Sequence, residues 1–265
     1  MSSVRIRETG EVLPDGLVAA ANDGARSSET ADSIESFEAT AVRLRAADGL
    51  VFGPDFRAVF EPSDGSLPIT LRPLVAEDRE ELRAGFRKLS PSVRFFRFFA
   101  DLGDLTEAQL DYLTTPDGTD HFALVATTAT ADLRLEQGLA VARFIRVTPG
   151  SSTAEVAITV TDDAQRKGLG RALLSTLALA ARERGITHFR MDVLASNEAM
   201  LTMAQRLGAD ELPSDEPDVR VFDLALPQSG SDLDQAHSLA RIWTETVESL
   251  RRNLTLKATS PRTSE

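Results

Sequence analysis

The sequence of 265 residues contains no cysteine. Without thiols, the chain cannot form a disulfide, ligate zinc through thiolates or use a cysteine nucleophile. Tryptophan and tyrosine occur once each and histidine three times, and no two histidines are spaced as a metal-binding pair. We therefore expect no metal site. The lack of disulfides is compatible with a reducing compartment, and a cytoplasmic location is our expectation.

Long apolar runs are also missing. No stretch reaches the roughly 18–20 apolar residues that a helix needs to cross a bilayer. Residues 1–9 lack the apolar core of a secretory signal. We therefore expect no membrane partner.

Positive charge is scarce. The 29 Lys and Arg residues face 41 Asp and Glu residues, for a formal net charge of −12. This excess of acid argues against nucleic acid as the main partner. An acidic surface usually serves solubility, although it could also attract a basic substrate.

Composition divides the chain into three parts. Residues 1–66 form an acidic extension that we expect to be largely disordered, with short strands within 42–60. Residues 67–227 carry regular strand and helix patterns and form the main domain. Residues 228–265 hold an amphipathic helix, with Trp243 on its apolar face, and a flexible tail. That helix either docks on its own domain or joins two copies into a homodimer.

The main domain alternates between strand and helix patterns. Period-two alternation and β-branched residues predict strands at 69–74, 121–127, 139–147, 153–160, 186–194 and 219–226. Helical spacing and capping signals predict helices at 77–89, 92–99, 106–113, 169–184 and 197–207. This order of elements indicates an α/β or α+β domain around a central sheet.

The segment Gln165-Arg166-Lys167-Gly168-Leu169-Gly170 lies between a predicted strand and the strongest predicted helix. The N-terminus of a helix leaves amide groups unpaired, and glycines let a phosphate approach that backbone closely. A dinucleotide fingerprint would need a glycine where Leu173 stands, and a P-loop would need Gly-Lys-Ser/Thr. The loop alone therefore indicates either a phosphate cradle or an ordinary glycine-rich turn.

Its context is more specific. The run Ala154-Glu155-Val156-Ala157-Ile158-Thr159-Val160, followed by Gln165-Arg166-Lys167-Gly168-Leu169-Gly170-Arg171-Ala172-Leu173-Leu174, resembles the GCN5-related N-acetyltransferase (GNAT) family. The diagnostic family loop is Gln/Arg-x-x-Gly-x-Gly/Ala between the fourth strand and the next helix. The resemblance spans residues 68–226.

The resemblance implies a mixed, mostly antiparallel central sheet that is splayed at the fourth strand, with helices on both faces and acetyl-CoA in the cleft. The pantetheine arm would pair with the backbone of Ile158, Thr159 and Val160, and Asn197 would hydrogen-bond to it or cap a helix. The pyrophosphate would lie on the loop. The residues thus implied in binding acetyl-CoA there are Gln165, Arg166, Lys167, Gly168, Leu169, Gly170 and Arg171.

The chemistry needs a base, because a protonated amine has no lone pair with which to attack. Glu155 is the candidate, since it lies on the polar face of the strand that would hold the donor. Apolar surroundings would raise its pKa, whereas the alternative is a solvated strand residue. Many family members carry a tyrosine where this chain has Ala204, and the only tyrosine, Tyr112, lies far upstream. Water would then protonate the leaving thiolate.

The acceptor is indicated by Leu89-Ser90-Pro91-Ser92-Val93-Arg94-Phe95-Phe96-Arg97-Phe98-Phe99 and by Asp120-His121-Phe122-Ala123-Leu124-Val125. Both stretches resemble bacterial protein lysine acetyltransferases. The resemblance implies a protein lysine as acceptor, with Arg94, Arg97 and His121 binding it. A core helix with solvated arginines is the structural alternative. A small amine as acceptor and a non-catalytic acetyl-CoA-binding module also remain open.

Overall fold

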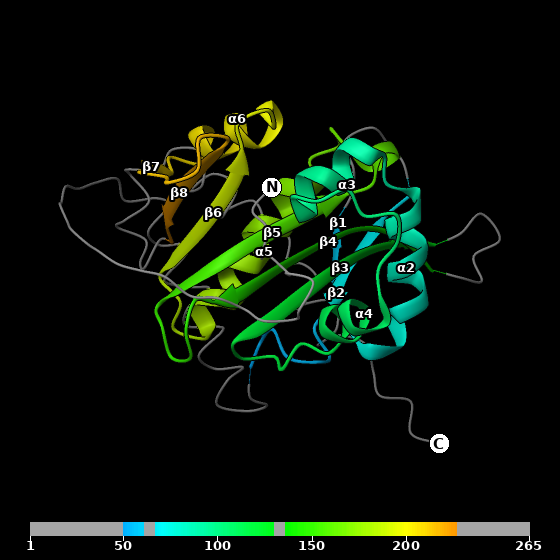
Figure 1. Cartoon of the computed structure of the whole chain (residues 1–265). Helices are drawn as coiled ribbons and strands as arrows, with labels where there is room; N and C mark the ends of the chain where they lie inside the picture. Colours follow the sequence, from blue (N-terminus) through cyan, green and yellow to red (C-terminus); the bar gives the residue numbers. More distant parts are fainter. Residues whose placement is uncertain (1–49, 61–66, 130–135, 227–265) are drawn as a thin grey trace, which may run out of the picture.

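The computed structural model describes residues 50–60, 67–129 and 136–226. These residues build one sheet of eight strands (Figure 1). Its spatial order is β1 (Ala58–Phe60), β2 (Ile69–Pro73), β3 (His121–Ala129), β4 (Glu136–Arg146), β5 (Thr153–Val160), β6 (His188–Leu194), β8 (Val219–Ala225) and β7 (Asp210–Leu212). All neighbours are antiparallel except β5 and β6. The predicted mixed, mostly antiparallel sheet is confirmed.

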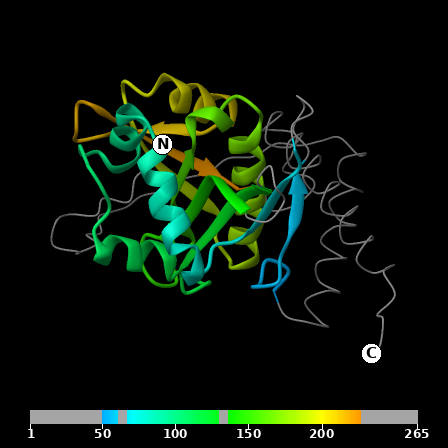
Figure 2. The ribbon, with the colours of Figure 1, turned by 90° about the vertical axis from the view of Figure 1, so that its right-hand side faces the viewer.

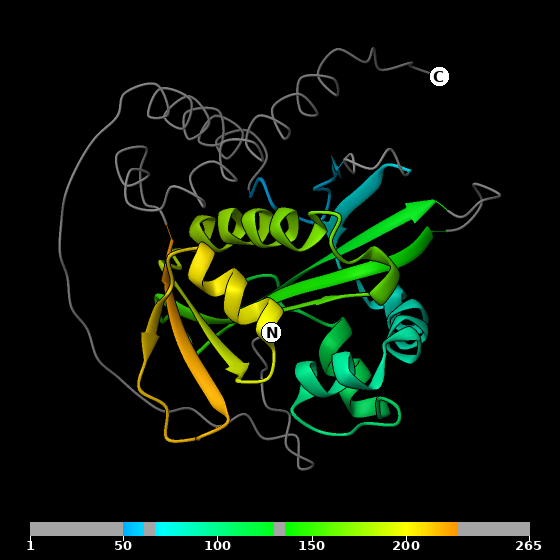
Figure 3. The same ribbon diagram turned by 90° about the horizontal axis from the view of Figure 1, so that it is seen from above.

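Helices cover both faces of this sheet (Figure 2). One face carries the short 3-10 helix η1 (Ala76–Asp78) followed by α2 (Arg79–Lys88), α3 (Pro91–Phe98) and α4 (Glu107–Thr114). The other face carries α5 (Leu169–Glu183), which follows the 3-10 helix η2 (Asp162–Ala164), with α6 (Glu198–Arg206) beside it (Figure 3). Among the described residues no helix is long and apolar enough to span a membrane.

The capping signals in the sequence set the helix boundaries. The Ser90 hydroxyl accepts the Val93 N–H at the start of α3, and a capping box of Thr106 and Gln109 begins α4. The predicted helix at 77–89 begins instead with the 3-10 turn η1. The short strand β7 has three exposed residues, so no apolar pattern predicted it.

The segment before β2 packs on the far end of α5. The carboxylate of Glu183 accepts the N–H groups of Val51 and Phe52 at 2.6 and 3.1 Å. Strand β1 then pairs with β2; it lies at the end of the stretch 42–60 for which short strands are predicted. Residues 42–49, the rest of the extension outside 50–60, and the helix predicted at 231–254 lie outside the described residues. The boundaries proposed for the three parts of the chain remain predictions.

The sheet opens between its two parallel strands. Strands β5 and β6 pair only where Thr153–Glu155 meets His188–Arg190, and then diverge (Figure 1). The Thr161 N–H donates to the Leu139 carbonyl of β4 at 2.9 Å. Because the backbone groups of successive strand residues alternate in direction, those of Ile158 and Val160 point away from β4, into the opening. The rest of β5 thus presents a backbone edge that no strand pairs among the described residues; of its outward groups, the Val160 carbonyl accepts from the Gln165 side chain.

Candidate active site

The loop at residues 165–170 joins the open edge of β5 to the start of α5. Gly168 has φ +83° at the position before the first helical residue, and Arg166 has φ +62°. The amides in the first turn of a helix have no intrahelical partner, and no side chain of the described residues caps α5. The side chain of Arg166 is exposed and that of Lys167 is half-buried. The loop therefore offers backbone donors and positive charge in one place.

The start of α5 lies close to β5. A Cβ added at Gly170 would meet Cγ2 of Val160 at 3.9 Å, and Nε2 of Gln165 donates to the Val160 carbonyl at 3.3 Å. The side chain of Leu169 is in the core and that of Arg171 is exposed. The predicted backbone contacts at Ile158, Thr159 and Val160 lie next to this loop. Of these, Thr159 turns its side chain into a cavity on the opposite face of the sheet from α5.

Asn197 stands across the opening, at the start of α6. Its Oδ1 accepts the Met200 N–H at 3.3 Å, as the predicted cap does. Its side-chain amide Nδ2 is buried and has no hydrogen-bond partner among the described residues. A buried donor without a partner is costly, and a ligand carbonyl in the opening would satisfy it.

Glu155 and His121 belong to one cross-strand row. Ile145 of the central strand β4 pairs with His121 of β3 on one side and with Glu155 of β5 on the other. Directly paired residues share a face, so Glu155 and His121 project from the side of the sheet that α4 covers. The ring of Tyr112, from α4, lies 5.2 Å from that of His121.

Electrostatics connect the same groups. Burial, and then the negative charge of Glu155, raise the pKa of Tyr112, against the opposing effect of Arg143 and Arg97. Tyr112 is therefore a neutral phenol close to Glu155. Sequence reasoning set Tyr112 aside because of its distance along the chain; helix α4 brings it to the site. The position expected for a tyrosine, Ala204, is fully buried in the core.

His121 is a buried, neutral ring. Its Nε2 lies 3.0 Å from Nη1 of Arg143, which has only protons to offer, so Nε2 accepts and the ring proton is on Nδ1. Burial and the charge of Arg143 lower the pKa of His121 to about 3. His121 therefore positions Arg143 and carries no charge at neutral pH.

The two arginines of α3 have different environments. Arg94 donates to the carbonyls of Leu89, Leu102 and Gly103, and its guanidinium lies over the Phe86 ring. Arg97 is only 6% exposed, whereas Phe95 on the same helix is 42% exposed. Amphipathic patterning predicts the reverse, because it places charge outside and aromatics inside.

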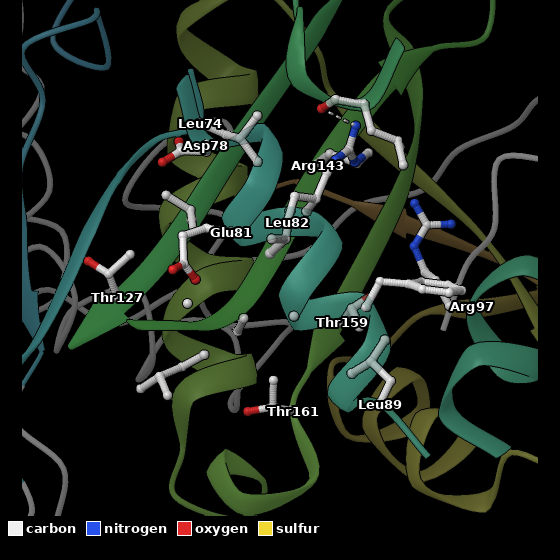
Figure 4. Close-up of a pocket in the computed structure, with 18 of the residues that line it drawn as sticks. Leu74, Asp78, Glu81, Leu82, Leu89, Arg97, Thr127, Arg143, Thr159 and Thr161 are labelled. Atoms are coloured by element: carbon white, nitrogen blue, oxygen red, sulfur yellow. Dashed lines mark hydrogen bonds between the residues drawn. The ribbon is translucent and has the colours of Figure 1, made fainter. Parts of the chain in front are cut away.

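A narrow cavity of about 90 Å³ lies between α2 and α3 and the face of β3, β4 and β5 (Figure 4). Its acidic end holds Asp78, which pairs with Arg72 at 2.7 Å, and Glu81. Its other end holds Arg97 and Arg143. Figure 4 shows these two guanidinium groups on the opposite side of the cavity from Asp78 and Glu81.

Helix α3 is tied to the turn that precedes the loop at residues 165–170. Asp162 of η2 accepts both the N–H and the hydroxyl of Ser90, each at 3.0 Å. Phe96 and Phe99 at the end of α3 pack against Leu194, Val219 and Val221 beyond the opening. Helix α3 therefore contacts both sides of the splayed sheet. No group of three side chains suited to a metal ion occurs in the described ranges.

Comparison with known proteins agrees with this geometry. A family model described as the acetyltransferase (GNAT) family matches residues 101–209. Acetyltransferase PA5475 of Pseudomonas aeruginosa is 32% identical over 148 residues, which cover 56% of this chain and 78% of that protein. The chain belongs to the GNAT family. The resemblance inferred from the loop and its strand is thereby confirmed.

Two further proteins are similar to this chain. Acetyltransferase Pat of Mycolicibacterium smegmatis is 37% identical over 139 residues, which cover 52% of this chain and 40% of that protein. This chain thus matches about two fifths of that relative's length. The crystal structure of the GNAT domain of S. lividans PAT is 29% identical, with a TM-score of 0.59, and the match covers 64% of this chain and 97% of that domain.

Proposed function

We propose that this GNAT protein transfers an acetyl group from acetyl-CoA directly to an amine, and that the amine is a lysine side chain of a protein. The observation that carries the proposal is the open backbone edge of β5, which runs from Glu155 to the uncapped start of α5. One strand thus presents a carboxylate at one end and a phosphate-binding loop at the other.

The donor fits this edge. The backbone of Ile158 and the N–H of Val160 would pair with the pantetheine arm, while the Val160 carbonyl accepts from Gln165. The Nδ2 of Asn197 would donate to a pantetheine carbonyl. The pyrophosphate would accept amide hydrogens at residues 166–170, with Arg166 and Lys167 contributing charge. Thr159, Gln165, Leu169 and Arg171 complete the proposed contact segment, in which buried Leu169 contributes its backbone.

Glu155 would act as the general base. It takes a proton from the acceptor ammonium, directly or through water, and the neutral amine then attacks the thioester carbonyl carbon. The C–N bond forms, the nitrogen releases a second proton to water, the C–S bond breaks, and the electron pair leaves on the CoA sulfur. Water protonates the thiolate, or the Tyr112 hydroxyl does. If Tyr112 is the proton donor, Tyr112→Phe lowers turnover and leaves acetyl-CoA affinity unchanged. If water is the donor, the variant changes neither quantity.

The lysine acceptor rests on the resemblance of the α3 sequence to protein lysine acetyltransferases. Arg94 is occupied by backbone carbonyls and Arg97 is buried, so these two residues do not form an open surface for a protein. A second candidate is a small amine that carries an anionic group. The buried arginines at one end of the cavity favour it.

Purified full-length protein with acetyl-CoA tests the activity. CoA release is measured against lysine-containing proteins and against small amines, and mass spectrometry locates the acetyl group. We expect acetyl-lysine on a protein acceptor. Acetyl-CoA binding without CoA release on any amine would show a binding module in place of an enzyme. Release with small amines alone would establish the second candidate.

A further inference from the structure

Arg97 is a buried cation without a counter-ion in the part of the chain that the structure describes. It makes no hydrogen bond or ion pair with the described residues, and its buried Nη1 has no partner there. Its guanidinium carbon lies 4.9 Å from the centroid of the Phe98 ring. The side chain nevertheless lines the cavity, so the unused donors border an accessible space.

Arg143 provides a second cation at the same place. It is 3% exposed and also lines the cavity. Its hydrogen bonds to the Leu113 carbonyl and to His121 both use Nη1, which leaves Nη2 without a partner in the described part of the chain. His121 cannot balance the charge, because it is itself neutral.

The two cations act on each other. Burial, followed by repulsion from Arg97, lowers the pKa of Arg143 to about 9, and burial lowers the pKa of Arg97 to about 10. Both remain protonated at neutral pH. Removing two like charges from water is expensive unless an anion pairs with them, and the acids that line this cavity lie at its far end.

We propose that the end of the cavity formed by Arg97 and Arg143 is a carboxylate-binding subsite for the transfer reaction. A planar guanidinium matches a carboxylate with two parallel hydrogen bonds, and a cavity of about 90 Å³ has room for such a small group. This inference rests on the proposed function, because it assigns the carboxylate to one of the two reacting molecules.

The subsite lies next to the proposed base. Arg143 pairs with Ala157, two residues from Glu155 on the same face of β5. Diagonal neighbours of this kind have Cα atoms about 7–8 Å apart. A carboxylate on Arg143 is therefore within reach of an amine at Glu155. Its source is either an acidic residue beside the acceptor lysine or the acyl group of a dicarboxylic acyl-CoA.

Matched substrates distinguish the two sources. With acetyl-CoA as donor, two peptides differ only in carrying Asp or Asn next to the lysine. With one neutral peptide as acceptor, succinyl-CoA is compared with acetyl-CoA. If the acceptor supplies the carboxylate, kcat/KM for the Asp peptide exceeds that for the Asn peptide by roughly tenfold or more. If the donor supplies it, succinyl-CoA has the same advantage.

Variants test whether the arginines cause the preference. Arg97→Met should bring the ratio of kcat/KM values, Asp peptide to Asn peptide or succinyl-CoA to acetyl-CoA, to about one. Arg97→Lys should retain part of the preference. Arg87→Gln is the control, since Arg87 lies exposed on α2 and pairs with Asp104, away from the cavity. It should leave both ratios unchanged. The melting temperature of Arg97→Met should stay equal or rise, because the variant removes a buried charge that has no partner.

A binding measurement separates failure of the subsite from failure of the proposed function. Succinate should raise the melting temperature of the native protein above the value in sodium chloride of equal ionic strength, succinamide should not, and Arg97→Met should abolish the effect. Acetyl transfer with equal rates for all matched substrates would overturn the subsite and leave the function standing. If no acceptor is acetylated, the succinate measurement still decides: stabilisation that needs Arg97 supports the subsite, and its absence overturns it.

Discussion

His121 and Glu155 face the same side of the sheet in one row, with Ile145 between them. His121 accepts a hydrogen bond from Arg143, and the tilted Tyr112 ring lies 5.2 Å from the His121 ring. The proposed base therefore lies on the same side of the sheet as a neutral imidazole, a neutral phenol and a buried cation. These groups come from two strands and a helix, and they shape the acceptor side of the proposed site.

Glu155→Gln should lower turnover by roughly 10²–10⁴ and leave acetyl-CoA affinity almost unchanged. The amide has the size of the carboxylate but takes no proton from the acceptor. Steady-state kinetics and calorimetric titration of acetyl-CoA check the two quantities. Glu77→Gln, at an exposed position in η1, should change neither. Native turnover of Glu155→Gln across the pH range would remove Glu155 from the mechanism.

Gly168→Ala should weaken acetyl-CoA binding strongly, because the loop needs φ +83° there and a Cβ disfavours it. Gly185→Ala is the matched control at the other end of α5, with φ +79° and no atom within 4 Å of an added Cβ. Both variants should lose about 1–2 kcal/mol of folding stability. Only the first should lose affinity in a binding titration. Equal affinities would show that the loop does not hold the donor.

Folding stability should fall as pH decreases from 7 to 5. The pKa of His121 is about 3 in the folded protein and about 6.5 when unfolded, so the unfolded state binds more protons between these values. The stabilisation that is linked to neutral His121 is complete above about pH 6.5 and is lost progressively as the pH falls towards 3. About 2 kcal/mol should disappear between pH 7 and pH 5.

The matched variant for that effect is His121→Gln. Glutamine can still accept from Arg143 but does not titrate, so this variant should show a pH dependence smaller by about 2 kcal/mol in urea unfolding. If the free energy of unfolding of this variant still differs between pH 7 and pH 5 as it does in the native protein, another group is responsible.

The effects of Asp162→Ala and Ser90→Ala on folding stability should be coupled. Asp162 accepts two hydrogen bonds from Ser90, and this contact links η2 to the start of α3. A double-mutant cycle in urea unfolding should give a coupling energy of about 0.5–1.5 kcal/mol. Asp163→Ala, at the exposed neighbouring position, should show no coupling to Ser90→Ala. A coupling energy near zero for Asp162 would show that the link does not stabilise the fold.

Local patterns predicted most of the elements. Alternation in β5, the apolar stripe of α5 and the caps at Ser90 and Thr106 depend on neighbouring residues alone, and the structure has each of them. The glycine loop and Glu155 were found because they are ten residues apart on one strand and turn. Strand β7 was missed, since an exposed three-residue strand carries no periodic signal.

The sequence by itself thus determined the family, and it located the proposed donor loop and the strand with the proposed base, because their signals lie within a short stretch of chain. Only the tertiary structure decided the acceptor side. Sheet register and the packing of α3 and α4 bring Arg97, Tyr112, His121 and Arg143 together, although these residues come from separate elements. Burial of Arg97 runs against its own polarity, and no local rule predicts that a charged side chain is enclosed in a cavity.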